Sequence, residues 1–194
     1  MMKWKNCLAV AMLAASSQAW AAPILNAQAT PNPVTVGSNV DVDVRIDDIA
    51  DLAGYQFTLN FNASLFQAIG VTEGAFLGSA GTTYFDGGAI DNTAGTISYV
   101  FNSLVGQVPG ASGSGSLASV RLQAIGAGGG LFSFSDLLFL DSNMGDIVVG
   151  ANSLQVGVLP AAANDVPEPA SYMLFGIGLI GAAALRRRSQ APRA

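Results

Sequence analysis

The middle of the chain is predicted to be all-β and to form a sandwich of two sheets. Short segments alternate between apolar and polar residues, clusters of turn-forming residues separate them, and no long segment there has helical period. Alternation with period two gives each strand one apolar face. Two sheets can bury such faces by packing against each other, so a β-sandwich is the expected fold class.

The expected strands include two clear alternating segments. In residues 40–46, valine and isoleucine alternate with Asp41, Asp43 and Arg45, which is typical of a half-buried strand with its charges in solvent. In residues 55–61, aromatic and aliphatic residues alternate with polar ones. The other expected strands are 65–71, 96–101, 117–124, 131–135, 147–149 and 153–158.

Glycine, serine and aspartate mark the connections between these strands. The expected turns are 51–54, 86–88, 110–115 and 126–130, because these residues favour turn conformations. We expect the glycine–serine repeat at 112–116 to be a loop within the domain, since a strand pattern resumes directly after it.

The N-terminus has the parts of a secretory signal peptide. Two lysines precede an apolar run at 7–15, and an A-x-A site ends at Ala21. We expect cleavage between Ala21 and Ala22, so that residues 1–21 are the signal. An uncleaved membrane anchor is the alternative, but the apolar run is too short to span a bilayer.

The C-terminus has an apolar stretch at 171–185 that ends at Arg186, Arg187 and Arg188. A helix over this stretch would be about 23 Å long, against a hydrocarbon core of ~30 Å, so it is a marginal transmembrane helix. Basic residues stay on the cytoplasmic side, which would place the folded part outside. A buried core helix is the alternative; the three arginines and the lack of a polar face argue against it.

A proline-rich motif, Val166, Pro167, Glu168 and Pro169, precedes this stretch. The motif, the apolar stretch and the basic cluster, over residues 166–190, resemble the PEP-CTERM sorting tail. The resemblance implies a substrate of exosortase, a membrane protease-transpeptidase of Gram-negative bacteria that make extracellular polysaccharide. The prolines keep the motif extended and accessible to such an enzyme. We therefore expect a membrane anchor before processing, and then the cell surface or extracellular matrix.

Residues 22–165, between the two end segments, are expected to form one domain. They hold two arginines and twelve acidic residues, a net charge of −10. Such a surface repels nucleic acid, so no nucleic-acid partner is expected. The only cysteine, Cys7, lies in the signal, which leaves the domain without a disulfide.

The same residues lack the side chains of the common catalytic mechanisms. The chain contains no histidine, and both lysines lie in the signal, which excludes Ser-His-Asp triads and Schiff-base chemistry. Glu73 is the only glutamate outside the tail, and nothing in the spacing gives it an aspartate partner for glycoside hydrolysis. We expect no enzyme activity and no cofactor.

The order of several segments resembles a cohesin-type module over about residues 30–158. The segments that carry the resemblance are 34–44, 51–62, 70–77, 115–122 and 140–143. The resemblance implies a jelly-roll sandwich of about nine strands, related to some carbohydrate-binding modules. In that family the domain binds another protein, the dockerin, or serves as a surface or carbohydrate-associated module, and it does not catalyse a reaction.

Two acidic turns are candidates for cation binding. Asp136, Asp141, Asn143 and Asp146 offer oxygen ligands at close spacing, as Ca²⁺ requires. The late bidentate glutamate of a calcium loop is missing, and a polar turn between strands is the alternative. A second acidic turn holds Asp47, Asp48 and Asp51.

Exposed aromatic side chains would favour sugar binding. Tyr84 and Phe85, in an expected glycine-rich loop, are the candidates for exposure, whereas Tyr55 is in phase with the core residues of its strand and is expected to pack inside. Removal of the signal takes away Trp4 and Trp20, which weakens the sugar-binding interpretation.

The sequence therefore predicts an exported, non-catalytic interaction protein of the cell surface or extracellular matrix. Its partners would be an exosortase-like sorting enzyme, the membrane through the C-terminal helix, and either a protein or a surface polysaccharide. A carbohydrate-binding module associated with exopolysaccharide is the alternative. A structural matrix subunit with no discrete ligand is a third interpretation.

Overall fold

The computed structural model describes residues 22–161. The signal peptide, the sorting motif, the apolar stretch at 171–185 and the basic cluster lie outside the described residues. Within residues 22–161, no helix has the length and apolar character needed to cross a membrane. The folded unit ends at Leu159.

The described part is almost entirely strand and contains a single helical turn, α1 (Ala75–Gly78). Its strands are β1 (Ile24–Thr30), β2 (Val34–Thr35), β3 (Asn39–Asn60), β4 (Phe66–Glu73), β5 (Thr83–Asp86), β6 (Ala89–Asp91), β7 (Thr96–Leu104), β8 (Ala111–Ala124), β9 (Gly128–Asp141), β10 (Gly150–Ala151) and β11 (Leu154–Leu159). The all-β prediction is confirmed.

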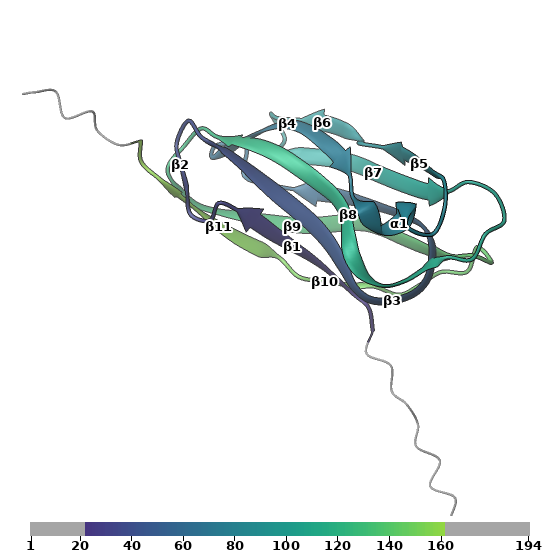
Figure 1. The fold of residues 1–194 in the computed structure, drawn as a ribbon. Coiled ribbons are helices and arrows are strands. Elements are labelled where there is room, and N and C mark those ends of the chain that lie inside the picture. Colours follow the sequence, from purple (N-terminus) through teal and green to yellow (C-terminus); the bar gives the residue numbers. More distant parts are fainter. Residues whose placement is uncertain (1–21, 162–194) are drawn as a thin grey trace, which may run out of the picture. The chain divides into compact units, whose positions relative to one another are not determined.

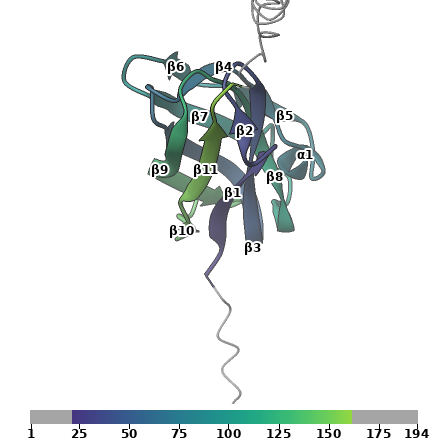
Figure 2. The same cartoon turned by 90° about the vertical axis from the view of Figure 1, so that its left-hand side faces the viewer.

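The strands form two layers that share the long strand β3 (Figure 1). Its first half pairs with β1 and β8, and β8 pairs with β4. Its second half pairs with β7 and β9, and these continue to β5, β6 and β11. At one edge, two short parallel pairings link β10 to β1 and β2 to β11, and Figure 2 shows β1, β2 and β11 neighbouring there.

The prediction of a turn at 51–54 is wrong, because these residues continue β3. Asp48 and Asp51 both have φ 57°, a left-handed conformation that aspartate tolerates better than most residues. The backbone N–H groups of Asp48 and Asp51 donate to Ser114 Oγ and Ser112 Oγ, each at 2.9 Å. These side chains replace ladder partners at the bend, so β3 changes layers without ending.

The expected loop at 112–116 is also wrong, because these residues belong to β8 and pair with the bend of β3. Three further expectations are wrong in detail. Residues 147–149 are not a strand, β9 begins within the predicted turn at 126–130, and Tyr84 and Phe85 lie in β5 and not in a loop.

The core lies between the two layers, where the inward residues of each strand meet. In β3, Val40, Val42, Val44 and Ile46 are fully buried, as their alternation predicts. Aromatic rings also stack in this core: the ring of Tyr55 lies 6.0 Å from that of Phe57 in the same strand and 6.2 Å from that of Phe139 in β9. Fully burying such side chains stabilises the fold by about 1.5–3 kcal/mol each.

The helical turn α1 closes the core beside β8. Its Leu77 is fully buried. The turn fits there because Gly74 and Gly115 have no side chains: a Cβ on Gly74 would lie 2.3 Å from Ser116 O, and one on Gly115 would lie 2.6 Å from the Phe76 ring.

A candidate docking face on the second sheet

The outer face of the first sheet, formed by β1, β3, β8 and β4, is mostly polar, although it includes an exposed apolar side chain, Ile69 of β4, which is 54% exposed. Its cross-strand rows carry Thr30, Asp41 and Arg121; Gln28, Asp43, Ser119 and Thr72; and Asn26, Arg45 and Ser116. Solvated polar side chains are the ordinary covering of a sheet face that contacts water.

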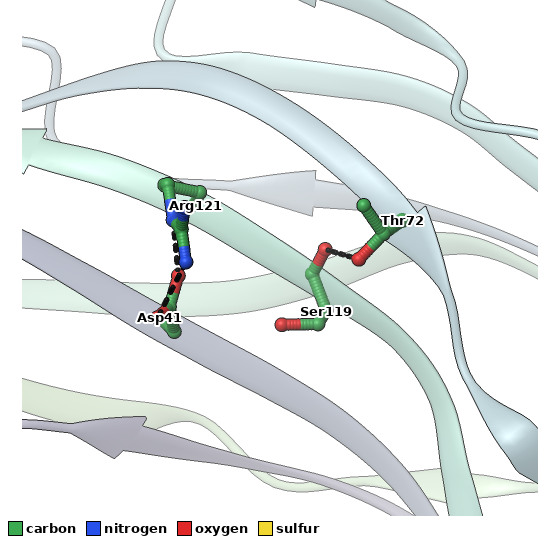
Figure 3. A network of polar contacts seen from close by, with 4 residues as sticks. All are labelled: Asp41, Thr72, Ser119 and Arg121. Atoms are coloured by element: carbon green, nitrogen blue, oxygen red, sulfur yellow. Dashed lines mark hydrogen bonds and ion pairs between the residues drawn. The ribbon is translucent and has the colours of Figure 1, made fainter.

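Both arginines of the described part form ion pairs on this polar face. Arg121 donates to the two carboxylate oxygens of Asp41 at 2.8 and 3.1 Å (Figure 3). Arg45 pairs with Asp43 at 3.1 Å. The hydrogen bond from Arg121 lowers the pKa of Asp41. Exposed pairs of this kind add at most about 1 kcal/mol to stability, and they neutralise both positive charges of the described part.

The outer face of the second sheet is different in character, because it exposes apolar side chains. Two rows cross this face in the strand order β5, β7, β3, β9. The first row is Tyr84, Ser103, Gly54 and Leu140, and the second is Asp86, Phe101, Gln56 and Leu138. Tyr84 is 63% exposed, Leu138 42% and Met144, in the following loop, 75%. The docking face is defined here as Tyr84, Phe101, Leu138, Leu140 and Met144.

A groove of about 300 Å³ runs through the docking face. Gly54 and Gln56 of β3 line it, together with Leu104 and Val108 on the β7 side. A Cβ on Gly54 would lie 3.6 Å from Ser103 Cβ, so the missing side chain leaves this position hollow. Exposed apolar patches with a concave centre mark interaction sites on soluble proteins.

Two loops form one end of the groove, 105–110 after β7 and 141–145 after β9. In the second loop, Asp141 Oδ1 accepts hydrogen bonds from the backbone N–H groups of Asn143 and Gly145 at 2.8 and 2.7 Å. Met144 adopts φ 64° in this turn, and its side chain lines the groove.

The four residues predicted for calcium lie along β9 and this loop. Asp136, with φ 51°, accepts a hydrogen bond from Ser135 Oγ at 3.3 Å, and Asp146 forms an isolated bridge with Leu140. Among residues 22–161, no three aspartate or glutamate side chains form a group that could hold a metal ion. The structure thus shows Asp141 ordering a polar turn, and calcium binding by these four residues stays a prediction.

The second acidic turn also serves the backbone and its neighbours. Asp47 Oδ2 accepts from Asn26 Nδ2 at 2.6 Å. Asp51 Oδ2 accepts from Ser142 Oγ at 2.6 Å, and its Oδ1 accepts from the Gly110 N–H at 2.8 Å. These hydrogen bonds, that from Ser142 first, lower the pKa of Asp51.

Glu73 belongs to a polar cluster at the edge of the core. Its Oε1 accepts from Thr83 Oγ1 at 2.6 Å and from Asn102 Nδ2 at 2.9 Å. The fully buried Asn102 leaves its Oδ1 without a partner. Tyr55 OH donates to Leu117 O at 2.5 Å, and burial raises the pKa of Tyr55. Glu73 therefore joins β4, β5 and β7, which is a structural role.

The aromatic predictions had mixed outcomes. Tyr55 is buried and Tyr84 is exposed, both as predicted, but Phe85 is half-buried. Sequence reasoning missed Leu138 and Met144. It also missed Tyr99, which is 59% exposed with φ 58°. Residues 137–140 are all apolar, so no alternation in the sequence separates the exposed Leu138 from the buried Phe139.

Comparison with known proteins gives the class of this fold. The cohesin domain family matches residues 26–158, and the PEP-CTERM protein-sorting motif matches residues 165–188. The chain therefore belongs to the cohesin family and carries a PEP-CTERM sorting motif. Cohesin domains are non-catalytic interaction modules, and the motif is that of an exported surface protein. Curated proteins give no match.

Solved cohesins share the fold at low sequence identity. A type II cohesin–X-dockerin complex from Acetivibrio cellulolyticus has a TM-score of 0.58 at 16% identity, covering 72% of this chain and 96% of that one. A non-cellulosomal cohesin from the archaeon Archaeoglobus fulgidus has 0.53 at 14%, covering 72% and 92%. A cohesin module of a Clostridium perfringens family 33 glycoside hydrolase has 0.56 at 11%, covering 70% and 97%.

Proposed function

We propose that this protein is an exported, non-catalytic interaction module that binds a protein partner through the docking face. One observation carries the proposal. The second sheet exposes several apolar side chains around a groove, whereas the outer face of the first sheet is mostly polar and exposes Ile69 among charged and hydroxyl side chains. An apolar face left in water is unfavourable, so a partner that covers it gains binding free energy.

The charges around the docking face specify the chemistry of that partner. Asp51, Asp86, Asp136 and Asp141 border the face, and both arginines of the described part lie on the other sheet. A second copy of this chain would bring like charges together, which costs binding energy. The partner is therefore a protein with an apolar surface and basic residues around it. Related cohesins occur in complexes with dockerins, so a dockerin-like protein is the first candidate.

The two ends of the chain support a route to the cell surface. In this proposal residues 1–21 direct export and are cleaved before Ala22. The apolar stretch at 171–185 then anchors the protein, and an exosortase-type enzyme recognises Val166 to Pro169. The product belongs to the surface or matrix of a Gram-negative bacterium. Intact mass of the fractionated protein tests this route: a mass that still includes the tail, in cells with an active exosortase, would contradict it.

The docking proposal is tested with paired variants of the full chain in detergent. Leu138→Lys places a charge in the docking face, and Gln28→Lys places the same charge on the polar face of the first sheet. The binding panel contains type I and type II dockerins. We expect at least one of them to bind the wild-type chain, to bind Leu138→Lys at least tenfold more weakly, and to bind Gln28→Lys with little change in affinity. Equal loss in both variants, or loss only in Gln28→Lys, would overturn the docking face.

A carbohydrate ligand is the second candidate, because two tyrosines are exposed on the same sheet. Tyr84 and Tyr99 are 63% and 59% exposed, and the Tyr84 ring lies 6.2 Å from that of Phe101. Sugars stack on aromatic rings of this kind. A glycan array separates the two candidates: saturable sugar binding that Tyr84→Ala removes, with no dockerin bound, favours polysaccharide.

A further inference from the structure

The Asp51 side chain lies where the two loops at the end of the groove meet. Its Oδ1 accepts a hydrogen bond from the Gly110 N–H at 2.8 Å, at the end of loop 105–110. Its Oδ2 accepts from Ser142 Oγ at 2.6 Å and from the Ser142 N–H at 3.3 Å, in loop 141–145. One carboxylate thus contacts both loops from a third element, the bend of β3.

Close packing between Gly110 and Asp51 supports the same conclusion independently. A Cβ on Gly110 would lie 2.3 Å from Asp51 C and 2.7 Å from Asp51 Oδ1. The first loop therefore lies directly against the bend of β3, and only glycine allows this approach.

The two loops contribute Val108 and Met144 to the groove. Each loop also has local hydrogen bonds, from the Val105 N–H to Thr82 O at 2.8 Å in the first and from the Asn143 and Gly145 N–H groups to Asp141 Oδ1 in the second. These bonds act within or beside one loop, whereas the Asp51 carboxylate contacts both. Charge-assisted hydrogen bonds to a carboxylate are stronger than neutral ones, so a single acidic side chain can order both segments.

We propose that Asp51 is the positioning residue of the docking face: it holds both loops in the arrangement that a partner recognises. This inference rests on the proposed docking function. In this proposal Asp51 does not contact the partner. Its role is to set the place of Val108 and Met144 before binding, so that the partner does not have to order the loops.

The chain offers a matched control in Asp48. Asp48 and Asp51 lie in the same bend, share φ 57°, and donate their backbone N–H to a serine Oγ at the same distance. Asparagine tolerates this backbone conformation, so Asp48→Asn and Asp51→Asn both remove one negative charge without backbone strain. Only the second removes the carboxylate that contacts Gly110 and Ser142.

The probe is a peptide selected by phage display on the full chain in detergent and counter-selected against Leu138→Lys, so that its binding requires the docking face. We expect Asp51→Asn to weaken its binding by about tenfold and Asp48→Asn by less than about twofold. Hydrogen exchange at the Gly110 and Ser142 amides should quicken in Asp51→Asn alone. Asp51→Gly, which keeps the backbone conformation and removes every acceptor, should weaken binding further than Asp48→Gly.

The outcomes separate this inference from the proposed function. If no selected peptide depends on Leu138, the docking face itself is wrong. If binding depends on Leu138 but is equal in wild type and Asp51→Asn, the positioning role is overturned and the docking face stands. A lower melting temperature in Asp51→Asn with unchanged peptide affinity would also overturn it, because that result describes a stabilising residue only.

Discussion

Leu138 and Phe139 are neighbours in β9 whose substitutions should have opposite effects. Leu138 points outward and is 42% exposed, whereas Phe139 points into the core and is 2% exposed. Phe139→Ala removes a ring that stacks 6.2 Å from the Tyr55 ring and leaves a cavity, which costs about 3–5 kcal/mol. Leu138→Lys removes burial that is only partial, and the lysine stem can cover the same surface. Its expected cost is about 1 kcal/mol or less.

Urea unfolding of the full chain in detergent, followed by circular dichroism, measures both free energies. In thermal unfolding, at about 2–5 °C of melting temperature per kcal/mol for a domain of this size, Phe139→Ala should lower the melting temperature by roughly 6–25 °C, and Leu138→Lys by at most about 5 °C. Ligand binding should respond in the reverse order. If Leu138→Lys destabilised the protein as much as Phe139→Ala does, the docking face would be part of the stabilising core. No apolar face would then remain free for a partner.

Three further predictions concern the acidic bend, the buried tyrosine and the helical turn. Hydrogen bonds lower the pKa of Asp51 from its ordinary value; the stabilisation is therefore present above about pH 3.9 and lost as pH falls through the folded-state pKa. Melting curves between about pH 2 and 6 should show this loss in the wild type and a flatter profile in Asp51→Asn. Tyr55→Phe removes the hydrogen bond from the Tyr55 hydroxyl to Leu117 O. The expected cost in urea unfolding is only about 0.5–1.5 kcal/mol, because Leu117 O still accepts from the Gly74 N–H. A larger loss would show that the hydroxyl orders more than this contact. Gly74→Ala should cost about 1–3 kcal/mol, since its Cβ would lie 2.3 Å from the β8 backbone; unchanged stability would mean that α1 moves freely.

Sequence reasoning succeeded where side-chain alternation and burial agree. The segment 40–46 has the predicted phase, with its valines and isoleucine inside and Asp41 and Arg45 outside. Tyr55 is buried for the same reason. Such segments are predictable because period two fixes which face each residue occupies, and the apolar face must be covered.

The bend of β3 and the repeat at 112–116 were not predictable from local composition. Aspartate, glycine and serine favour turns in isolation, but Ser112 and Ser114 accept hydrogen bonds from β3 across the sheet. Residues distant in sequence thereby convert two expected loops into paired strands. The docking face was missed for a related reason: its members come from four segments, and only the register of β5, β7, β3 and β9 brings them together.

The bend also explains why one strand serves two faces of opposite character. Before it, the outward positions of β3 carry Asp41, Asp43 and Arg45; after it, they carry Gly54 and Gln56, which line the groove. A period-two strand keeps its phase only along a regular ladder, and the register of β3 with β8 shifts three times between Val44 and Leu52. The irregular segment therefore resets which side chains face outward, and it does so at the position where Asp51 meets both groove loops. Bulges that redirect a strand near a binding surface are a recurrent device in β proteins, and here the same few residues determine the layer change, the floor of the groove and the loops at its end.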